Sequence, residues 1–230
     1  SRHKATYRLH YHDYKYFPYE KKLARKETQS LGTVSRFIES PGSLEISLKS
    51  INERNTHDLV YFSKSESKKA DPTFTRQHKL EASQNSTKKQ STRYSVHGLH
   101  EYKGKFNPQI VRGILNIANP NTGGTILDPF SGSGTTLVEC ALDGRHAIGT
   151  DLNPLAVFIA NTKIQSLKLS PNEILKGFTK FSASLAKAKL KKKTVTDERL
   201  TYLEKWFKPD ILEFIETTFR IANKQTTDVK

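Results

Sequence analysis

The sequence predicts an α/β fold that contains part of a Rossmann-like, doubly wound sheet, with a basic segment on each side. Two observations in the central part lead to this prediction. A strand-like run over residues 125–127 is followed by a glycine-rich turn and a helical run, and a second strand-like run over 146–150 is followed by another helical run. This order of strand, turn, helix, strand and helix is half of a doubly wound sheet. A third observation, the distribution of charge described below, predicts the basic segments on each side.

In the N-terminal part, a short helix is expected over residues 19–27, after Pro18. Residues 43–50 alternate apolar and polar side chains and predict a strand, and residues 57–63 are a second candidate strand. Residues 63–95 are rich in Ser, Lys, Thr and Gln. We interpret them as a polar, mobile linker or as a loop that becomes ordered on a ligand.

The central part begins with a helix expected from Pro108, because apolar residues follow it at helical spacing. A turn over residues 119–124 then leads to the strand over 125–127, and a helix is expected over 133–142. After the second strand, Asn153 is suited to cap a helix whose first residue is a proline and which continues to about residue 164. Further helices are expected over residues 174–185, 200–207 and 211–221.

The net charge of +15 is unevenly distributed over the 230 residues. Residues 106–164 hold three basic and four acidic side chains, whereas residues 1–105 hold 21 basic against 11 acidic, and residues 165–230 hold 14 against 8. A nearly neutral core between basic flanks suits a partner made of phosphates. The alternative is a surface that keeps the protein soluble.

Other classes are disfavoured by composition. The single cysteine, Cys140, excludes an internal disulfide framework and a cysteine-rich metal site, and we expect no metal. Runs of 18 apolar residues are lacking, so no membrane span or membrane partner is expected.

The glycine turn indicates the ligand. In a doubly wound sheet, ligands bind beyond the carboxyl ends of the strands, and here the two strands end in Asp128 and Asp151. The turn is neither G-x-G-x-x-G nor a phosphate-binding loop, and an acid beside it would repel a pyrophosphate. Asp151 is placed to accept ribose hydroxyls, and Asp128 to hold an ammonium group. S-adenosylmethionine carries both groups. The alternative is a turn that only caps a helix.

Three segments resemble motifs of the DNA amino-methyltransferases, which methylate adenine N6 or cytosine N4. The segment D-P-F-S-G-S-G-T-T at residues 128–136 resembles their motif I, and H-E-Y-K-G-K-F-N-P at 100–108 resembles motif X. The segment G-R-H-A-I-G-T-D-L-N-P at 144–154 resembles motif II. The resemblance covers roughly residues 95–165. It implies the S-adenosylmethionine-dependent methyltransferase fold, S-adenosylmethionine as cofactor, DNA as partner, a role in restriction and modification, and a cytoplasmic location.

The resemblance also implies roles for individual residues. Asp128 is expected near the methionine ammonium and Asp151 at the ribose, while Leu152 and Asn153 border the adenine. The methionine moiety is expected to be lined by the turn and closed by the motif X segment. The cofactor-binding residues implied in this way are Lys105, Phe106, Pro108, Asp128, Pro129, Phe130, Ser131, Gly132, Ser133, Gly134, Thr135, Asp151, Leu152 and Asn153. For Phe106 the alternative is core packing, and for Lys105 it is a plain surface charge.

The catalytic motif of the family, [D/N/S]-P-P-[Y/F/W], is missing, because none of the nine prolines are adjacent. The catalytic residues are therefore unknown. We expect a missing segment or a second polypeptide to supply them and to complete the sheet.

The expected organisation is a basic N-terminal segment over residues 1–62 that contacts DNA, the linker over 63–95, the cofactor-binding core over 96–165 and a basic helical segment over 166–230. Two other functions stay open. One is an RNA base methyltransferase, because some enzymes that act on guanosine N2 carry a similar D-P-F-x-G-S-G. The other is a nucleic-acid-binding subunit without activity.

Overall fold

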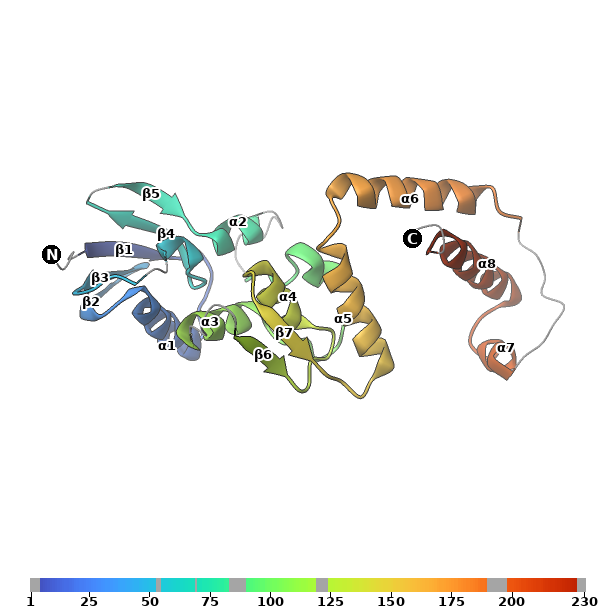
Figure 1. Cartoon of the computed structure of the whole chain (residues 1–230), viewed down its shortest axis with the longest axis horizontal. Helices are drawn as coiled ribbons and strands as arrows, with labels where there is room; N and C mark the ends of the chain where they lie inside the picture. Colours follow the sequence, from blue (N-terminus) through green and yellow to red (C-terminus); the bar gives the residue numbers. More distant parts are fainter. Residues whose placement is uncertain are drawn as a thin grey trace. The chain divides into compact units, whose positions relative to one another are not determined.

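A computed structural model describes residues 5–52, 55–68, 70–82, 90–118, 124–189 and 198–226 (Figure 1). The chain divides into two compact units, Ser1–Leu167 and Lys168–Lys230. Among the described residues, no helix is long and apolar enough to cross a membrane.

The first unit contains an antiparallel sheet of five strands in the order β2-β3-β1-β4-β5. A two-residue turn joins β2 to β3, and its Gly42 has a φ of 78°, which side chains other than glycine rarely adopt. In β3 every second residue is buried, so one face of the sheet is apolar. The strands are β1 (Ala5–Tyr11), β2 (Val34–Ser40), β3 (Ser43–Leu48), β4 (Phe62–Ser67) and β5 (Ala70–Phe74).

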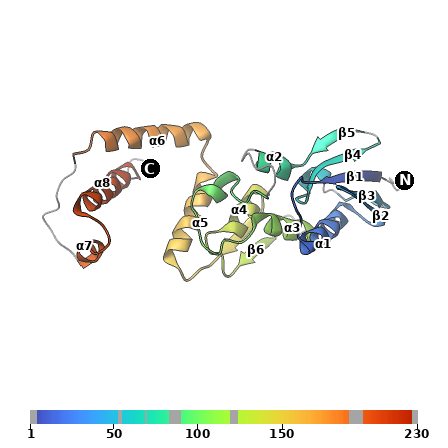
Figure 2. The same cartoon turned by 180° about the vertical axis from the view of Figure 1, so that it is seen from behind.

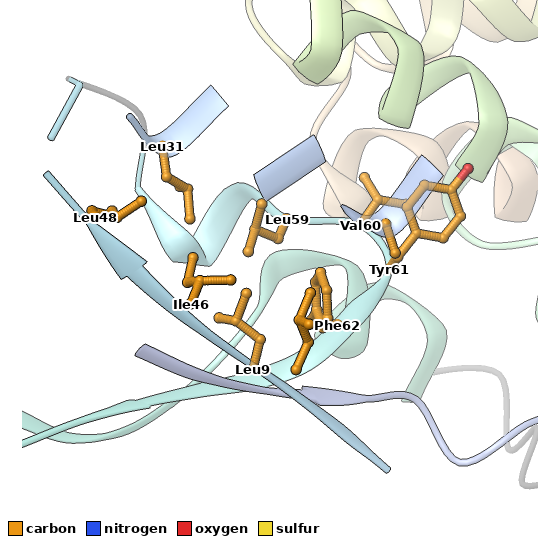
Figure 3. Packing of buried hydrophobic residues seen from close by; sticks show 10 residues of the cluster. Leu9, Leu31, Ile46, Leu48, Leu59, Val60, Tyr61 and Phe62 are labelled. Atoms are coloured by element: carbon orange, nitrogen blue, oxygen red, sulfur yellow. The ribbon is translucent and has the colours of Figure 1, made fainter. Parts of the chain in front are cut away.

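That apolar face forms the larger core of the unit. Figure 3 shows Leu9, Ile46 and Phe62 directed from the strands toward Leu31 and Leu59. Helix α1 (Pro18–Glu27) contributes its buried Ala24 to the same core. The helix starts with a proline, whose missing N–H is not needed at that position, and the Glu20 carboxylate accepts a bond from the Phe17 N–H at 2.7 Å.

The α/β part follows, and its strands are parallel. Strand β6 (Thr125–Asp128) pairs with β7 (His146–Gly149) in register from Thr125–His146 to Asp128–Gly149. Helix α4 (Thr135–Leu142) connects them, α3 (Pro108–Ala118) precedes them, and α5 (Pro154–Ser166) follows. Figure 2 gives the opposite view of these elements. The predicted order of strand, helix, strand and helix is confirmed, while the doubly wound arrangement stays a prediction.

Buried Glu27 links the antiparallel sheet to this α/β part. Its carboxylate accepts bonds from the backbone N–H groups of Val60 (2.9 Å) and Tyr61 (3.3 Å), which lead into β4. It also accepts a bond from the Asn116 amide on α3. The same amide donates to the Asp58 carbonyl at 2.9 Å. The Glu27 carboxylate thus supplies an acceptor to two buried backbone N–H groups and to the Asn116 amide.

The prediction of a linker over residues 63–95 is wrong where the structure describes it. Strands β4 and β5 and helix α2 (Arg76–Ala82) occupy residues 62–67, 70–74 and 76–82, and residues 69 and 83–89 lie outside the described residues. The polar composition of this segment led to the wrong prediction, because several of its hydroxyl groups form hydrogen bonds inside the fold. Ser65 bonds the Thr56 hydroxyl at 2.8 Å, and the Thr75 hydroxyl donates to the Phe62 carbonyl at 2.6 Å.

Two boundaries also differ. The strand expected over residues 57–63 is wrong for most of its length: Thr56–Asp58 is a 3-10 turn and β4 begins at Phe62. The turn expected over 119–124 lies almost entirely outside the described residues.

The second unit consists of helices α6 (Pro171–Ala186), α7 (Glu198–Leu203) and α8 (Pro209–Thr226). Helix α6 begins with a capping box, in which Ser170 and Glu173 bond each other's backbone N–H groups. The helix expected over residues 200–207 is shorter than predicted and ends at Leu203. Part of the basic run after α6 lies in residues 190–197, which are outside the described residues.

We predict that Glu27→Ala lowers the free energy of unfolding by roughly 2–3 kcal/mol, because three buried donors lose their acceptor. Glu45→Ala, which breaks a surface ion pair with Arg8 at 3.6 Å, should change it by less than about 1 kcal/mol. Urea unfolding of the chain compares the two. Equal losses would show that Glu27 does not hold the sheet to α3.

Candidate functional site

The loop between β6 and α4 has a backbone that needs glycine. Gly132 has a φ of 51° and Gly134 a φ of 81°. A Cβ at Gly134 would lie 2.8 Å from the Cβ of Ala160, so the loop rests directly on α5. The Gly134 N–H donates to the Ser131 carbonyl at 2.8 Å, which closes the turn before α4 begins.

The two strand ends are joined by hydrogen bonds at this loop. The Asp151 carboxylate accepts bonds from the N–H groups of Gly132 and Asn153, both at 2.8 Å. Ser131 N–H donates to the Thr150 carbonyl at 2.9 Å. The Asp128 carboxylate accepts a bond from the Phe130 N–H at 3.1 Å. Both predicted acids therefore lie at the carboxyl edge of the parallel pair, and Asp151 fixes the loop.

A hollow of about 380 Å³ opens beside the loop, within the size range of small-molecule sites. Motif X and the loop form its walls, and the ring of Tyr102 lies 3.6 Å from where a Gly132 side chain would begin. Its lining comprises Tyr102, Gly104, Lys105, Phe106, Leu127, Asp128, Phe130, Ser131, Gly132, Ser133, Thr135 and Thr136.

Eight of the fourteen residues predicted for the site line this hollow: Lys105, Phe106, Asp128, Phe130, Ser131, Gly132, Ser133 and Thr135. Of the others, Pro108 is buried at the start of α3, Leu152 is fully exposed and Asn153 caps α5. Pro129, Gly134 and Asp151 belong to the loop or its support. The sequence analysis missed Tyr102, Gly104, Leu127 and Thr136, although each lies inside or beside a quoted motif.

A buried carboxylate holds the two walls together. Glu139, on α4, accepts bonds from the Tyr94 hydroxyl (2.8 Å), the His97 Nε2 (2.8 Å) and the Arg112 Nε on α3 (2.9 Å). Its side chain is fully buried. Burial raises the pKa of Glu139, but the bond from His97 and the charge of Arg112 outweigh burial and hold the pKa below its ordinary value of 4.5.

Lys105 lines the hollow and is bonded to the segment that contains His97. Its Nζ donates to the Thr92 carbonyl at 2.6 Å and lies 3.5 Å from the His97 carbonyl. Burial, followed by the charge of Arg93, lowers the pKa of Lys105. Lys105 is therefore bonded to the fold rather than being a plain surface charge.

Lys163, on α5, lies beneath the loop and was not predicted. It is 1% exposed, and its Nζ donates to the backbone carbonyl (3.1 Å) and the hydroxyl (3.3 Å) of Ser133. Burial, followed by the charge of Lys105, lowers its pKa. A usable signal was present, because Lys163 shares helical spacing with the buried Ala156 and Ala160.

The outer face of the parallel pair is apolar and uncovered. Leu127 and Ile148 are neighbours in register and are 64% and 57% exposed. On α5, Leu155 and Phe158 are also exposed, although other residues of the same helix are buried. Parallel strands are normally buried on both faces, so such an exposed apolar face is unusual for a parallel pair.

Within the described ranges, no group of three or more His, Cys, Asp or Glu side chains is placed to hold a metal ion.

Comparison with known proteins points to one family. The family model described as DNA methylase, of the N6/N4 type, matches residues 2–162. Similar relatives include the Type II methyltransferase M.MjaII of Methanocaldococcus jannaschii, 48% identical over 79 residues, which are 34% of this chain and 14% of the relative. The Type II methyltransferase M.BsoBI of Geobacillus stearothermophilus is 37% identical over 62 residues, 27% of this chain and 12% of the relative.

A tRNA (guanine(10)-N2)-dimethyltransferase of Methanothermobacter thermautotrophicus is also similar, with 29% identity over 75 residues, 33% of this chain and 22% of the relative. The chain thus spans a small part of the length of each of these relatives.

We predict that Glu139→Gln lowers the free energy of unfolding by roughly 3 kcal/mol at neutral pH, since buried Arg112 loses the nearer of its two carboxylate partners and keeps Asp143 at 3.6 Å. The lowered pKa of Glu139 stabilises the native protein above about pH 4.5, and this stability is lost as the pH falls through the folded-state pKa. The difference in the free energy of unfolding between wild type and variant should therefore become smaller in acid.

Denaturant unfolding at several pH values measures this gap, and Glu101→Gln, on an exposed side chain, is the control. A gap that stays constant down to about pH 3 would contradict the assignment of a charged Glu139.

Proposed function

This chain belongs to the N6/N4 DNA methylase family, and from that premise we propose that it is the S-adenosylmethionine-binding part of a DNA methyltransferase. The methyl acceptor would be the exocyclic amine of cytosine (N4) or adenine (N6). One observation carries the proposal. The Asp151 carboxylate accepts a hydrogen bond from the Gly132 N–H, and this loop borders a hollow that Asp128 lines.

The residues around the hollow fit the two ends of this cofactor. Asp128 offers a carboxylate to the methionine ammonium, and Lys105 lies on the opposite motif. Asp151 offers carboxylate oxygens to the ribose hydroxyls. Phe106 and Phe130 expose their rings at the rim, where they would cover apolar parts of the ligand.

When bound, the cofactor supplies a methyl group on a positively charged sulfur, which the amine attacks directly. The protein contributes by aligning the two reactants and by excluding water. Gly132 and Ser133 would orient the methionine end through the loop, and Tyr102 would narrow the opening. The pocket for the target base, with its acceptor groups and stacking ring, requires the motif that this sequence lacks.

We therefore propose that a further polypeptide segment, on this chain's natural continuation or on a second chain, completes the enzyme. The exposed Leu127–Ile148 pair supports this, because helices of the added segment would cover this face of the sheet. The exposed apolar side of α5 supports it as well.

An RNA methyltransferase is the second candidate. Its support is the similarity to two archaeal tRNA (guanine(10)-N2)-dimethyltransferases. The family match and the Type II relatives favour DNA. Competition between duplex DNA and tRNA for the completed protein separates the two candidates.

We predict that Asp151→Ala weakens S-adenosylmethionine binding by roughly 1.5–3 kcal/mol, because the ribose loses a charged acceptor and Gly132 loses its anchor. Asp71→Ala, on the exposed part of β5, is the matched control and should leave binding unchanged. Ligand-detected NMR measures both affinities. Equal affinities of the two variants for S-adenosylmethionine would show that the ribose does not bind at Asp151.

The basic flanks lead to a second prediction. Nucleic-acid binding by the completed enzyme should weaken steeply with salt. On duplex DNA, each phosphate contact should add about −0.9 to the slope of the logarithm of the binding constant against the logarithm of the salt concentration. Fluorescence anisotropy over a salt series gives the slope. A slope near zero would mean that the excess of Lys and Arg in residues 1–105 and 165–230 serves solubility.

The proposed function is tested by methyl transfer. This chain alone should bind S-adenosylmethionine weakly and transfer no methyl group to mixed-sequence duplex DNA, since the base pocket is missing. Adding a polypeptide that carries [D/N/S]-P-P-[Y/F/W] from a similar relative should restore transfer, measured with labelled cofactor. Transfer above background by the chain alone would overturn the proposal of an incomplete site, and transfer to tRNA only would favour the second candidate.

A further inference from the structure

Lys163 is buried at a place where a lysine is costly. Removing an ammonium group from water is unfavourable unless it is paired, and buried lysines usually have a charged partner. Here the two acceptors are the carbonyl and hydroxyl of Ser133, at 3.1 and 3.3 Å, and both are neutral.

The charges around Lys163 do not compensate for its burial. The charged group that acts on it is another ammonium, that of Lys105, which lines the hollow. In the part of the chain that the structure describes, no carboxylate forms an ion pair with Lys163. Asp151 instead accepts bonds from the N–H groups of Gly132 and Asn153, and Asp128 from that of Phe130.

The lining of the hollow therefore carries charges of both signs. Asp128 contributes a carboxylate, while Lys105 and Ser133, with Lys163 directly behind it, contribute positive charge. A ligand group that carries an ammonium and a carboxylate on the same carbon atom matches charges of both signs. A phosphate would match the two lysines and be repelled by Asp128.

We propose that Lys163 is a positioning residue of the cofactor site: it fixes Ser133 in the glycine loop and, with Lys105, makes the pocket select ligands that carry an α-carboxylate. This inference rests on the proposed function, since the carboxylate is that of the methionine moiety. The ligand supplies the negative charge that the buried lysine lacks.

The test compares S-adenosylmethionine with decarboxylated S-adenosylmethionine, which keeps the adenosine, sulfonium and ammonium. Ligand-detected NMR on the full chain measures weak affinities of both. Wild type should prefer the carboxylated ligand by about tenfold or more, and Lys163→Met should lose most of that preference. The control Lys168→Met, on an exposed lysine after α5, should keep it.

Two further variants separate charge from structure. Lys163→Gln retains a donor for Ser133 without the charge, so it tests the inference even where the Met variant fails to fold. Ser133→Ala removes the hydroxyl acceptor but leaves the charge, and it should keep the preference.

An equal loss of affinity for both ligands in Lys163→Gln, with the preference intact, would overturn the inference and leave Lys163 a structural residue. Wild type that binds neither ligand at millimolar concentration would instead overturn the proposed cofactor site itself.

Discussion

The site depends on one buried carboxylate, that of Glu139. The helix that follows the glycine loop and the helix that follows motif X share apolar contacts of Val111, Leu115 and Cys140, and Arg112 pairs with Asp143 at the end of α4 at 3.6 Å. Glu139 adds charged hydrogen bonds to Arg112 and His97 across this contact, so the two walls of the hollow keep a fixed distance. Such bonds are strong because the paired groups are buried, and removing one partner is costly for the other.

The same physics explains the arrangement of the unit. Glu27 bonds the antiparallel sheet to α3, and Glu139 bonds α3 to α4, so α3 connects the sheet with the loop. The loop itself is fixed from both sides, by Asp151 through Gly132 and by Lys163 through Ser133. The ligand would therefore meet a backbone that is already in place, which lowers the entropy lost on binding.

The sequence predicted what local patterns control and missed what packing controls. The parallel pair, α3, α4 and α5 follow from periodicity, caps and the glycine turn, and they were predicted within a few residues. The five-stranded sheet was largely missed, because β4 and β5 are Ser-, Lys- and Thr-rich and gain stability from pairing and buried hydroxyl bonds such as that of Ser65. In the site, motifs identified most of the hollow. Lys163 was missed because its role arises from contact with Ser133, which lies thirty residues away in sequence.

We propose that the loop between β6 and α4, with motif X beside it, binds S-adenosylmethionine or its product. Backbone amide chemical shifts of the isotope-labelled chain, recorded with increasing S-adenosylhomocysteine, test it most directly. We expect saturable shifts centred on Lys105, Gly132, Ser133 and Asn153, with little change in residues 168–230. Absence of shifts at the loop, or shifts confined to α6 and α8, would contradict it.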